Sequence, residues 1–224
     1  MHSPDATKLY KKSASRNPME IFVRRASFED LSRIVELENA IWPEGTRAPR
    51  EKFEKRLSIF PEGFLLAFKD NQLIGASTSQ IISYIKGNSI KSWEQVTDNG
   101  YIEKTHNPGG NALYIVSLGA LSRSGGGSAL IAKQKELTQH LGLSVLVLGA
   151  RISGYDVYCR TTKEIPIEEY AHLQRADNCL YDDELRFYIR NGLTIQTIMP
   201  NYMEDDAESR NYGAIMIWEN PSLQ

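Results

Sequence analysis

Three consecutive glycines, Gly125 to Gly127, stand between an apolar run and a helical pattern, and they constrain the fold more than any other feature. The run before them, 111–118, is apolar on both faces, as in a strand at the centre of a covered sheet. Glycine allows a tight turn in which main-chain N–H groups point into a common hollow. The N-terminus of the following helix adds unpaired amides and partial positive charge. The unit therefore predicts a phosphate-binding loop with Arg123 at its rim.

The residues around the glycines narrow the choice of phosphate ligand. A P-loop needs Gly-Lys-Ser/Thr at the end of the turn, whereas Gly127 is followed by Ser128 and Ala129. A dinucleotide fingerprint needs a third glycine where Leu130 stands. The pyrophosphate of coenzyme A is the remaining common ligand of such a unit. The alternative is a glycine-rich connection that only turns a corner.

Composition excludes several broad classes. The chain has 224 residues, 41% of them hydrophobic and 24% charged, as in ordinary globular proteins. A net charge of −2 without a basic stripe argues against nucleic acid as a partner. No apolar stretch has the length of a membrane span, and the N-terminus lacks a signal-like apolar core. The two cysteines, Cys159 and Cys179, lack metal-ligand spacing, so we expect reduced thiols and a cytoplasmic protein.

Periodicity along the chain predicts one α/β domain over 20–219, with a flexible tail at 1–19 and a short tail at 220–224. A capping box, Ser27-x-x-Asp30, opens the first helix. The strands are expected at 21–25, 63–69, 72–82, 111–121, 145–148, 193–199 and 213–218. Helices are expected at 31–41, 50–59, 93–96, from the glycine loop to Gly142, near 166–174, and from Asp182 or Asp183 to Asn191. The rest of 83–110 and of 150–180 is expected to be irregular.

This order of elements resembles the GNAT acetyltransferase superfamily over roughly 20–219. Two motifs carry the resemblance: Leu113–Leu141, and Leu185-Arg-Phe-Tyr-Ile-Arg-Asn-Gly-Leu193, which is similar to the family's Phe-Tyr-x-x-x-Gly-Phe signature. A narrower likeness at 101–110, 149–155 and 200–209 is to the GNAT-type domain that some proteins carry ahead of a nitrilase-like hydrolase domain. The resemblance implies an α/β fold with a mixed, strongly twisted central sheet, covered by helices on both faces, whose two central parallel strands splay apart.

The resemblance also implies a ligand and its site. Acetyl-CoA would be the acyl donor, with no metal. Its pantetheine arm would pair with the strand backbone and its pyrophosphate would lie on 123–128. The residues expected to bind it are Leu118, Gly119, Ala120, Ser122, Arg123, Ser124, Gly125, Gly126, Gly127 and Ser128. The loop departs from the family pattern, since it is shorter and lacks a proline. The acceptor amine would enter near the loop 42–47, where Trp42 and Glu44 are candidate contacts.

Acyl transfer to an amine needs an acid for the leaving thiolate and a base for the amine. Tyr188 matches the family's tyrosine and is the candidate acid, because a phenol stays protonated at neutral pH. Its alternative role is a core side chain, since Leu185, Tyr188 and Ile189 share a helical face. The central strand has Ser117 where several relatives place Glu. Glu103 and His106 are therefore the candidate bases, and the alternative for His106 is to stabilise its Asn-Pro-Gly-Gly turn.

Taken together, these residues predict an N-acetyltransferase that moves an acetyl group from acetyl-CoA to a primary amine by direct attack. The acceptor is a small molecule or a protein, with no nucleic acid or membrane as partner, and a homodimer is left open. The alternative is a catalytically degenerate acyl-CoA-binding or protein-interaction module with the same fold. A Rossmann-type nucleotide domain is disfavoured, because 63–82 predicts adjacent antiparallel strands.

Overall fold

The computed structural model describes residues 20–87 and 90–223. Within them a seven-stranded sheet has the order β1-β2-β3-β4-β5-β7-β6. Only β4 and β5 are parallel, and every other neighbouring pair is antiparallel. The strands are β1 (Phe22–Arg25), β2 (Leu65–Lys69), β3 (Gln72–Ile82), β4 (Ala112–Ala120), β5 (Val145–Arg151), β6 (Thr194–Met199) and β7 (Gly213–Glu219). The predicted mixed sheet is confirmed. The predicted tail at 1–19 lies outside the described residues.

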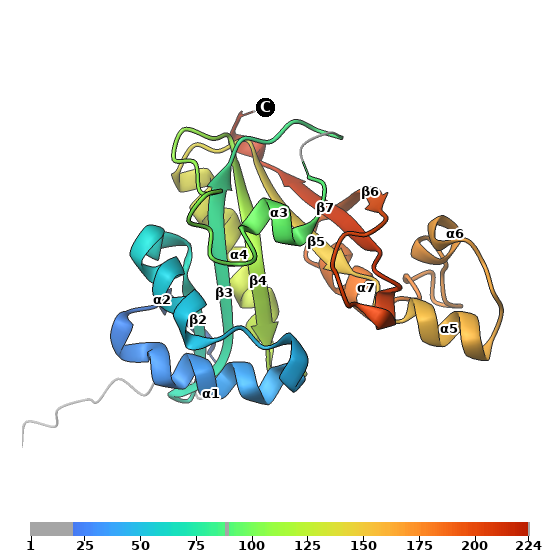
Figure 1. The fold of residues 1–224 in the computed structure, drawn as a ribbon, viewed down its shortest axis with the longest axis horizontal. Coiled ribbons are helices and arrows are strands. Elements are labelled where there is room, and N and C mark those ends of the chain that lie inside the picture. The colour runs from blue at the N-terminus through green and yellow to red at the C-terminus, as the bar shows by residue number, and fades with distance from the viewer. Residues whose placement is uncertain (1–19, 88–89, 224) are drawn as a thin grey trace, which may run out of the picture.

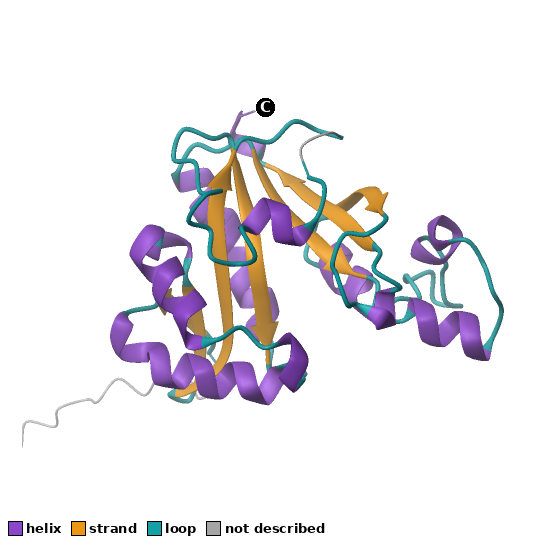
Figure 2. Cartoon of the chain, viewed as in Figure 1, coloured by secondary structure: helices purple, strands orange, loops and turns teal. Residues whose placement is uncertain are grey.

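Helices cover both faces of this sheet (Figures 1 and 2). On the near face lie α1 (Leu31–Ile41), α2 (Arg50–Ile59) and α3 (Trp93–Thr97), and on the far face lie α4 (Gly126–His140) and α7 (Asp183–Arg190). The remaining two, α5 (Tyr155–Thr161) and α6 (Ile167–Ala171), project to one side of the sheet. Helices on both faces are what the family resemblance implied.

Local capping explains where the helices that shape the site begin and end. The Ser27 amide donates to Asp30 Oδ2 at 2.9 Å, so the predicted capping box forms ahead of α1. Asp182 caps α7 by accepting from the amides of Glu184 and Leu185. Gly142, with φ of 65°, follows the C-terminal end of α4 in the left-handed region that favours glycine.

The projecting arm of α5 and α6 was not fully predicted, because α5 has no apolar periodicity readable over seven residues. Aromatic packing holds the arm together. Tyr170 lies with its ring centroid 5.3 Å from that of Tyr155 and 5.2 Å from that of Tyr158. Tyr158 also contacts Tyr181 edge-on at 5.2 Å. The arm therefore forms through contacts between segments rather than through local pattern.

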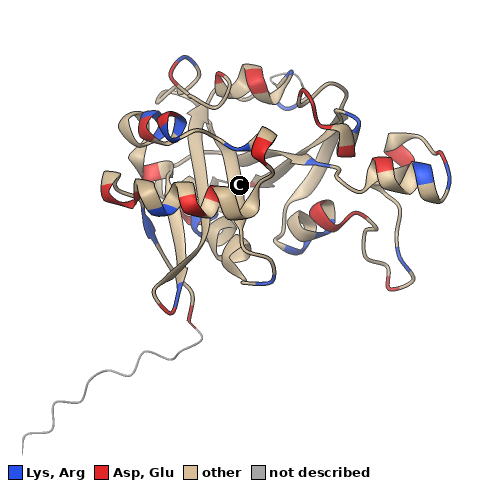
Figure 3. Ribbon diagram, turned by 60° about the horizontal axis from the view of Figure 1, so that its bottom comes forward, with Lys and Arg blue, Asp and Glu red and all other residues tan. Residues whose placement is uncertain are grey.

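Charged residues of both signs are interspersed over the described surface (Figure 3). This distribution fits a net charge of −2, and no face of one sign stands out in that view. No helix among residues 20–87 and 90–223 combines the length and the apolarity needed to cross a membrane.

Candidate functional site

The glycine loop joins the end of β4 at Ala120 to the start of α4 at Gly126. Gly125 is the N-cap of α4, with φ of 82°, and Arg123 also lies in the left-handed region at 57°. The Gly126 amide donates to Ser124 Oγ at 3.1 Å. In the described part of the chain, the amides of Gly125, Gly127 and Ser128 have no hydrogen-bond partner. These are the free donors that an anion at a helix N-terminus requires.

Packing accounts for two of the glycines as well. A β-carbon on Gly126 would lie 3.3 Å from the Ile74 carbonyl oxygen, and one on Gly127 would lie 3.0 Å from the Phe187 ring. The first turn of α4 is thus pressed against β3 on one side and α7 on the other. The alternative role of the glycines, a connection that only turns the chain, is therefore supported by this packing as well. Close packing and free amides are compatible, because the unpaired N–H groups lie on the loop side of the helix.

The two parallel strands separate along their length, as Figure 1 shows. They pair only from Ala112 with Val145 to Tyr114 with Val147, although β4 runs on to Ala120 and β5 to Arg151. Beyond these pairs the facing strand edges are not joined to each other. An unpaired strand edge can bind an extended ligand through main-chain hydrogen bonds. The opening contains the backbone of Leu118–Ala120 and ends at the glycine loop.

Three aromatic side chains close the apex of this opening, and we call Trp93, Tyr114 and Tyr202 the apex cluster. The Tyr114 hydroxyl, from β4, lies 2.5 Å from the Tyr202 hydroxyl, and the Tyr202 ring packs against Gly149 on β5. Trp93 Nε1 donates to the Val116 carbonyl at 2.9 Å. The apex cluster therefore joins the two diverging strands across the gap.

The Val116 carbonyl accepts from Trp93 instead of from β3 because the sheet is irregular at this position. The pairing of β3 with β4 shifts between Thr78, opposite Ser117, and Ser79, opposite Ile115, so that Val116 has no partner on β3. Bulges of this kind locally end the ladder and re-aim backbone groups. The bulge faces the opening at the level where α3 crosses it.

Tyr188 lies on α7, on the far side of the opening, and is buried. Burial is the main cause that raises the pKa of this phenol well above its usual value, and Glu184 and Tyr114 raise it further. The hydroxyl forms no hydrogen bond with any described residue. The raised pKa keeps this phenol protonated at neutral pH, and its hydroxyl is available to a ligand. Its role as the acid remains a prediction.

Two carboxylates near these phenols were missed from the sequence. Glu184 stands one helical turn before Tyr188, and burial raises its pKa to about 8. Its Oε1 accepts from the Arg151 amide at 3.2 Å. Glu94 on α3 accepts from the Glu204 amide at 3.0 Å through Oε1, while its Oε2 is buried without a partner in the described chain. The spacing of Glu184 from Tyr188 was readable in the sequence. Glu94 gave no signal, because the segment 83–110 has little periodicity.

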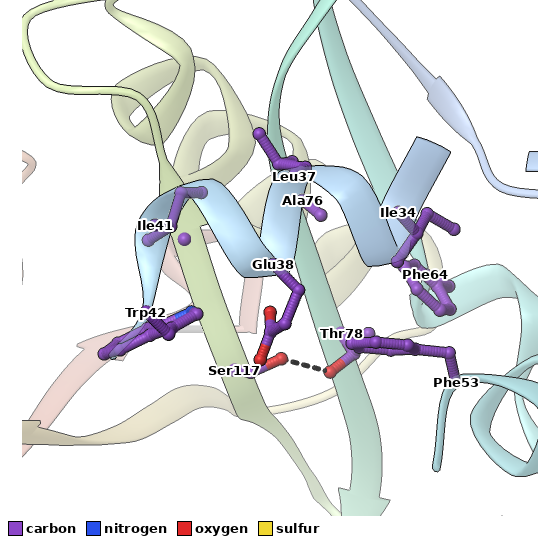
Figure 4. A pocket seen from close by; sticks show the side chains of 11 residues that line it. Ile34, Leu37, Glu38, Ile41, Trp42, Phe53, Phe64, Ala76, Thr78 and Ser117 are labelled. Carbon is purple, nitrogen blue, oxygen red and sulfur yellow. Dashed lines mark hydrogen bonds between the residues drawn. The ribbon is translucent and has the colours of Figure 1, made fainter. Parts of the chain in front are cut away.

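A narrow cavity lies between α1 and the strands β3 and β4 (Figure 4). Glu38 points from α1 toward Ser117, whose hydroxyl lies 2.8 Å from that of Thr78. The buried Arg56 guanidinium donates to both hydroxyls, at 3.1 and 3.2 Å. Burial raises the pKa of Glu38 and lowers that of Arg56 to about 10, and the opposite charge of each group opposes the shift of the other.

Of the two predicted acceptor contacts, Trp42 lines this cavity. Trp42 ends α1, and its Nε1 would lie 3.2 Å from a β-carbon on Gly119, so the indole covers the unpaired half of β4. Glu44 lies in the short 3-10 turn Glu44–Thr46 and is exposed. The loop is held by Glu38, whose Oε1 accepts from the Ala48 amide at 2.8 Å.

Among the described residues, neither predicted base forms a hydrogen bond or an ion pair with Tyr188. His106 accepts from the Ile81 amide through Nδ1 at 3.1 Å and stacks on Phe60 at 4.8 Å. Ile81 pairs with Leu113, at the opposite end of β4 from Gly119. Glu103 is exposed and forms an ion pair with Lys55 at 3.2 Å. Both residues have structural partners, and their catalytic roles stay predictions.

Across the ranges 20–87 and 90–223, no group of three or more His, Cys, Asp or Glu side chains is arranged to hold a metal ion.

Comparison with known proteins gives two curated relatives, both from Bacillus subtilis strain 168, while no family model matches the sequence. The chain is 30% identical to the "Uncharacterized N-acetyltransferase YkwB" over 205 residues, which cover 88% of each chain. It is 31% identical to the "Probable hydrolase YhcX" over 219 residues, 96% of this chain. The chain spans only 40% of the length of YhcX. A partial match to a larger hydrolase agrees with the narrower resemblance noted above.

Solved structures share the fold. The loading GNATL domain of CurA from Lyngbya majuscula superimposes with a TM-score of 0.78 at 23% identity, over 91% of this chain and 99% of that one. The GphF GNAT-like decarboxylase in complex with isobutyryl-CoA gives 0.73, also at 23% identity, over 89% and 99%. These likenesses establish the architecture, and the second shows that a protein of this fold binds an acyl-CoA.

Proposed function

Since the chain belongs to the GNAT acetyltransferase superfamily, we propose that it transfers an acetyl group from acetyl-CoA to a primary amine by direct attack on the thioester. One observation carries the proposal: β4 and β5 part after Tyr114 and Val147, and the opening leads to a helix N-terminus with free amides. An extended chain that ends in a pyrophosphate fits both features.

The residues present fit such a donor. The amides of Gly125, Gly127 and Ser128 are unpaired, and Arg123 stands exposed beside them. The absence of β-carbons on the glycines leaves the main chain open to close approach. The unpaired edge of Leu118–Ala120 offers main-chain groups to the amide-bearing pantetheine arm. We assign the pyrophosphate to the loop and the arm to the strand edge.

The chemistry follows from the groups around the opening. Main-chain amides at the edge of β4 that faces β5, beyond their last pair, would stabilise the oxyanion that forms on the thioester carbonyl. Tyr188 would donate its proton to the departing sulfur, which suits a phenol whose pKa is raised and whose hydroxyl has no other partner. The acceptor would enter beside the loop that carries Trp42 and Glu44. Of the two, Trp42 lies against Gly119 of β4.

The acceptor is an amine of a small molecule or of a protein. The relative YkwB is named as an N-acetyltransferase without a stated substrate, which supports the reaction class and leaves the acceptor for experiment.

Two measurements test the proposal in sequence. Calorimetric titration of the full chain with acetyl-CoA and with coenzyme A should give binding, and thiol release from acetyl-CoA should then depend on one member of a panel of primary amines. Binding without amine-dependent release under any condition would favour an acyl-CoA-binding module instead. Absence of binding would overturn both the acetyltransferase and the acyl-CoA-binding module.

A further inference from the structure

The cavity between α1 and the strands β3 and β4 holds a carboxylate that the chemistry proposed above does not use. Glu38 points into it from α1 toward Ser117 (Figure 4). Its Oε1 accepts from the Ala48 amide at 2.8 Å, whereas Oε2 is hydrogen-bonded to no described donor and is not sealed from solvent. One oxygen therefore fixes the side chain and the other is open to a ligand. Glu38 is the only titratable side chain among the described residues that line the cavity.

The cavity reaches the part of β4 that lies beyond its pairing with β5. Ser117 and Gly119 line it, and both follow Tyr114, the last residue of β4 that pairs with β5. Gly119 has no β-carbon, so the strand backbone itself borders the space beside Trp42. The cavity has a volume of about 10 Å³, which is room for one water-sized group such as an amino group. The carboxylate and the strand segment assigned to the donor thus border the same small space.

The groups around Glu38 suit a carboxylate that accepts a proton. Burial raises its pKa above the usual value, while the Ala48 amide and the positive charges of Arg56 on α2 and Arg47 in the loop after α1 oppose this shift. Among the described residues that line the cavity, those of β3 and β4 are hydroxyl-bearing or apolar, and none is charged. A raised pKa makes a carboxylate a stronger base, and the two cations favour its ionised form.

Resting on the function proposed above, we infer that the amino group of the acceptor enters this cavity and that Glu38 is the base that takes its proton. The nitrogen attacks the thioester carbon and forms the C–N bond, which makes its N–H acidic, and Glu38 Oε2 accepts that proton. The C–S bond breaks, its electron pair stays on sulfur, and Tyr188 protonates the thiolate. Glu38 then gives its proton to water, and Tyr188 takes one from water. One proton thus moves from nitrogen to sulfur, and no further reactant is needed.

Glu38→Gln isolates the base, because its amide oxygen can still accept from Ala48 while the carboxylate is lost. We expect kcat to fall about 100-fold, with the acetyl-CoA Kd unchanged. In the wild type, log kcat/KM for the amine should fall more steeply once pH drops below the pKa of Glu38, because the amine and the carboxylate are then both protonated. That extra steepness should be absent from Glu38→Gln. Glu36→Gln, on the exposed face of α1, is the matched control and should behave as the wild type.

A second variant tests the entry of the amine without changing Glu38. Ala76 lines the cavity from β3, and a valine there would occupy the water-sized space. We expect Ala76→Val to lower kcat/KM for the amine about 10-fold or more, mainly through KM. The acetyl-CoA Kd should stay unchanged. Thermal unfolding and donor titration establish that each variant is folded.

The outcomes separate this inference from the function on which it rests. If the wild type releases coenzyme A with an amine and Glu38→Gln does so within about threefold, or keeps the steeper fall at low pH, Glu38 is not the base and the acetyltransferase stands. Wild-type kcat/KM in Ala76→Val would show that the amine enters elsewhere and would also overturn the inference. If the wild type releases none with any amine, the proposed function fails and this inference falls with it. Loss of the steeper fall at unchanged stability and donor affinity supports the base, since a merely structural role would not remove it.

Discussion

Tyr202 packs directly against Gly149, so that a β-carbon at Gly149 would overlap the Tyr202 hydroxyl. Gly213 on the adjacent strand β7 meets the same ring in the same way. The loop that follows β6 therefore sets its tyrosine on a flat patch of two neighbouring strands, where only glycine leaves room. This contact fixes the Tyr202 hydroxyl beside that of Tyr114 and so determines the shape of the apex.

Gly149→Ala should destabilise the protein. The added methyl group overlaps a fully buried side chain, and overpacking of this kind costs about 1–3 kcal/mol. Urea unfolding followed by circular dichroism would measure the loss in free energy of unfolding. Gly45→Ala is the control, since nothing lies within 4 Å of a β-carbon at Gly45. Equal stability of the two variants would show that Tyr202 does not occupy this position.

Tyr188→Phe should lower kcat about 100-fold and leave the acetyl-CoA Kd nearly unchanged. The substitution removes only the hydroxyl, which has no partner in the described chain, and keeps the buried ring on α7. Steady-state thiol release and calorimetric titration measure the two quantities separately. Unaltered turnover would rule out Tyr188 as the acid.

Ser128→Pro should weaken acetyl-CoA binding about 10-fold. Proline removes an amide N–H that makes no intrahelical bond in the first turn of α4, so the helix itself loses little. A hydrogen bond to a charged group contributes about 1.5–3 kcal/mol, which sets the scale of the loss. Ser128→Ala keeps the amide and serves as the control in the same titration. If both variants bind as the wild type does, the pyrophosphate does not lie on this turn.

Glu184 should make stability depend on pH. Burial raises its pKa in the folded protein to about 8, against about 4.3 in an unfolded chain. The folded state therefore holds this proton more tightly than the unfolded chain does. The stability that the protonated Glu184 contributes is fully present below about pH 4 and is lost as pH rises toward 8. Glu184→Gln replaces the titrating carboxyl group with a neutral amide and should flatten the dependence of stability on pH. Unfolding free energies at pH 5, 7 and 9 should show the variant gaining on the wild type as pH rises. A constant difference would contradict the raised pKa.

Much of the fold was readable from local pattern. The helix 50–59 begins and ends where periodicity and its flanking prolines predicted, and the Asp182 cap and the Gly142 stop both form. Capping and turn chemistry act over a few residues, so a sequence can report them. The helix α5 escaped prediction, since it forms on the tyrosine cluster it shares with α6.

In the candidate site, too, the features set by local pattern were predicted and those set by tertiary packing were not. The glycine loop was predicted because strand, turn and helix are contiguous, and its free amides follow from the helix N-terminus. The predicted bases came from chemical type alone, and the structure gives each another partner: His106 accepts from the Ile81 amide and Glu103 pairs with Lys55. No local pattern reports the end of a strand at which such an insertion packs.

The sequence by itself determined the mixed α/β architecture, the glycine turn and the helix that presents Tyr188, since each depends on neighbours within a few residues. Only the tertiary structure decided that the hydroxyls of Tyr114 and Tyr202 would meet. The two tyrosines come from segments far apart in the chain, and they meet because β4 and β5 diverge and side chains have to fill the gap between them.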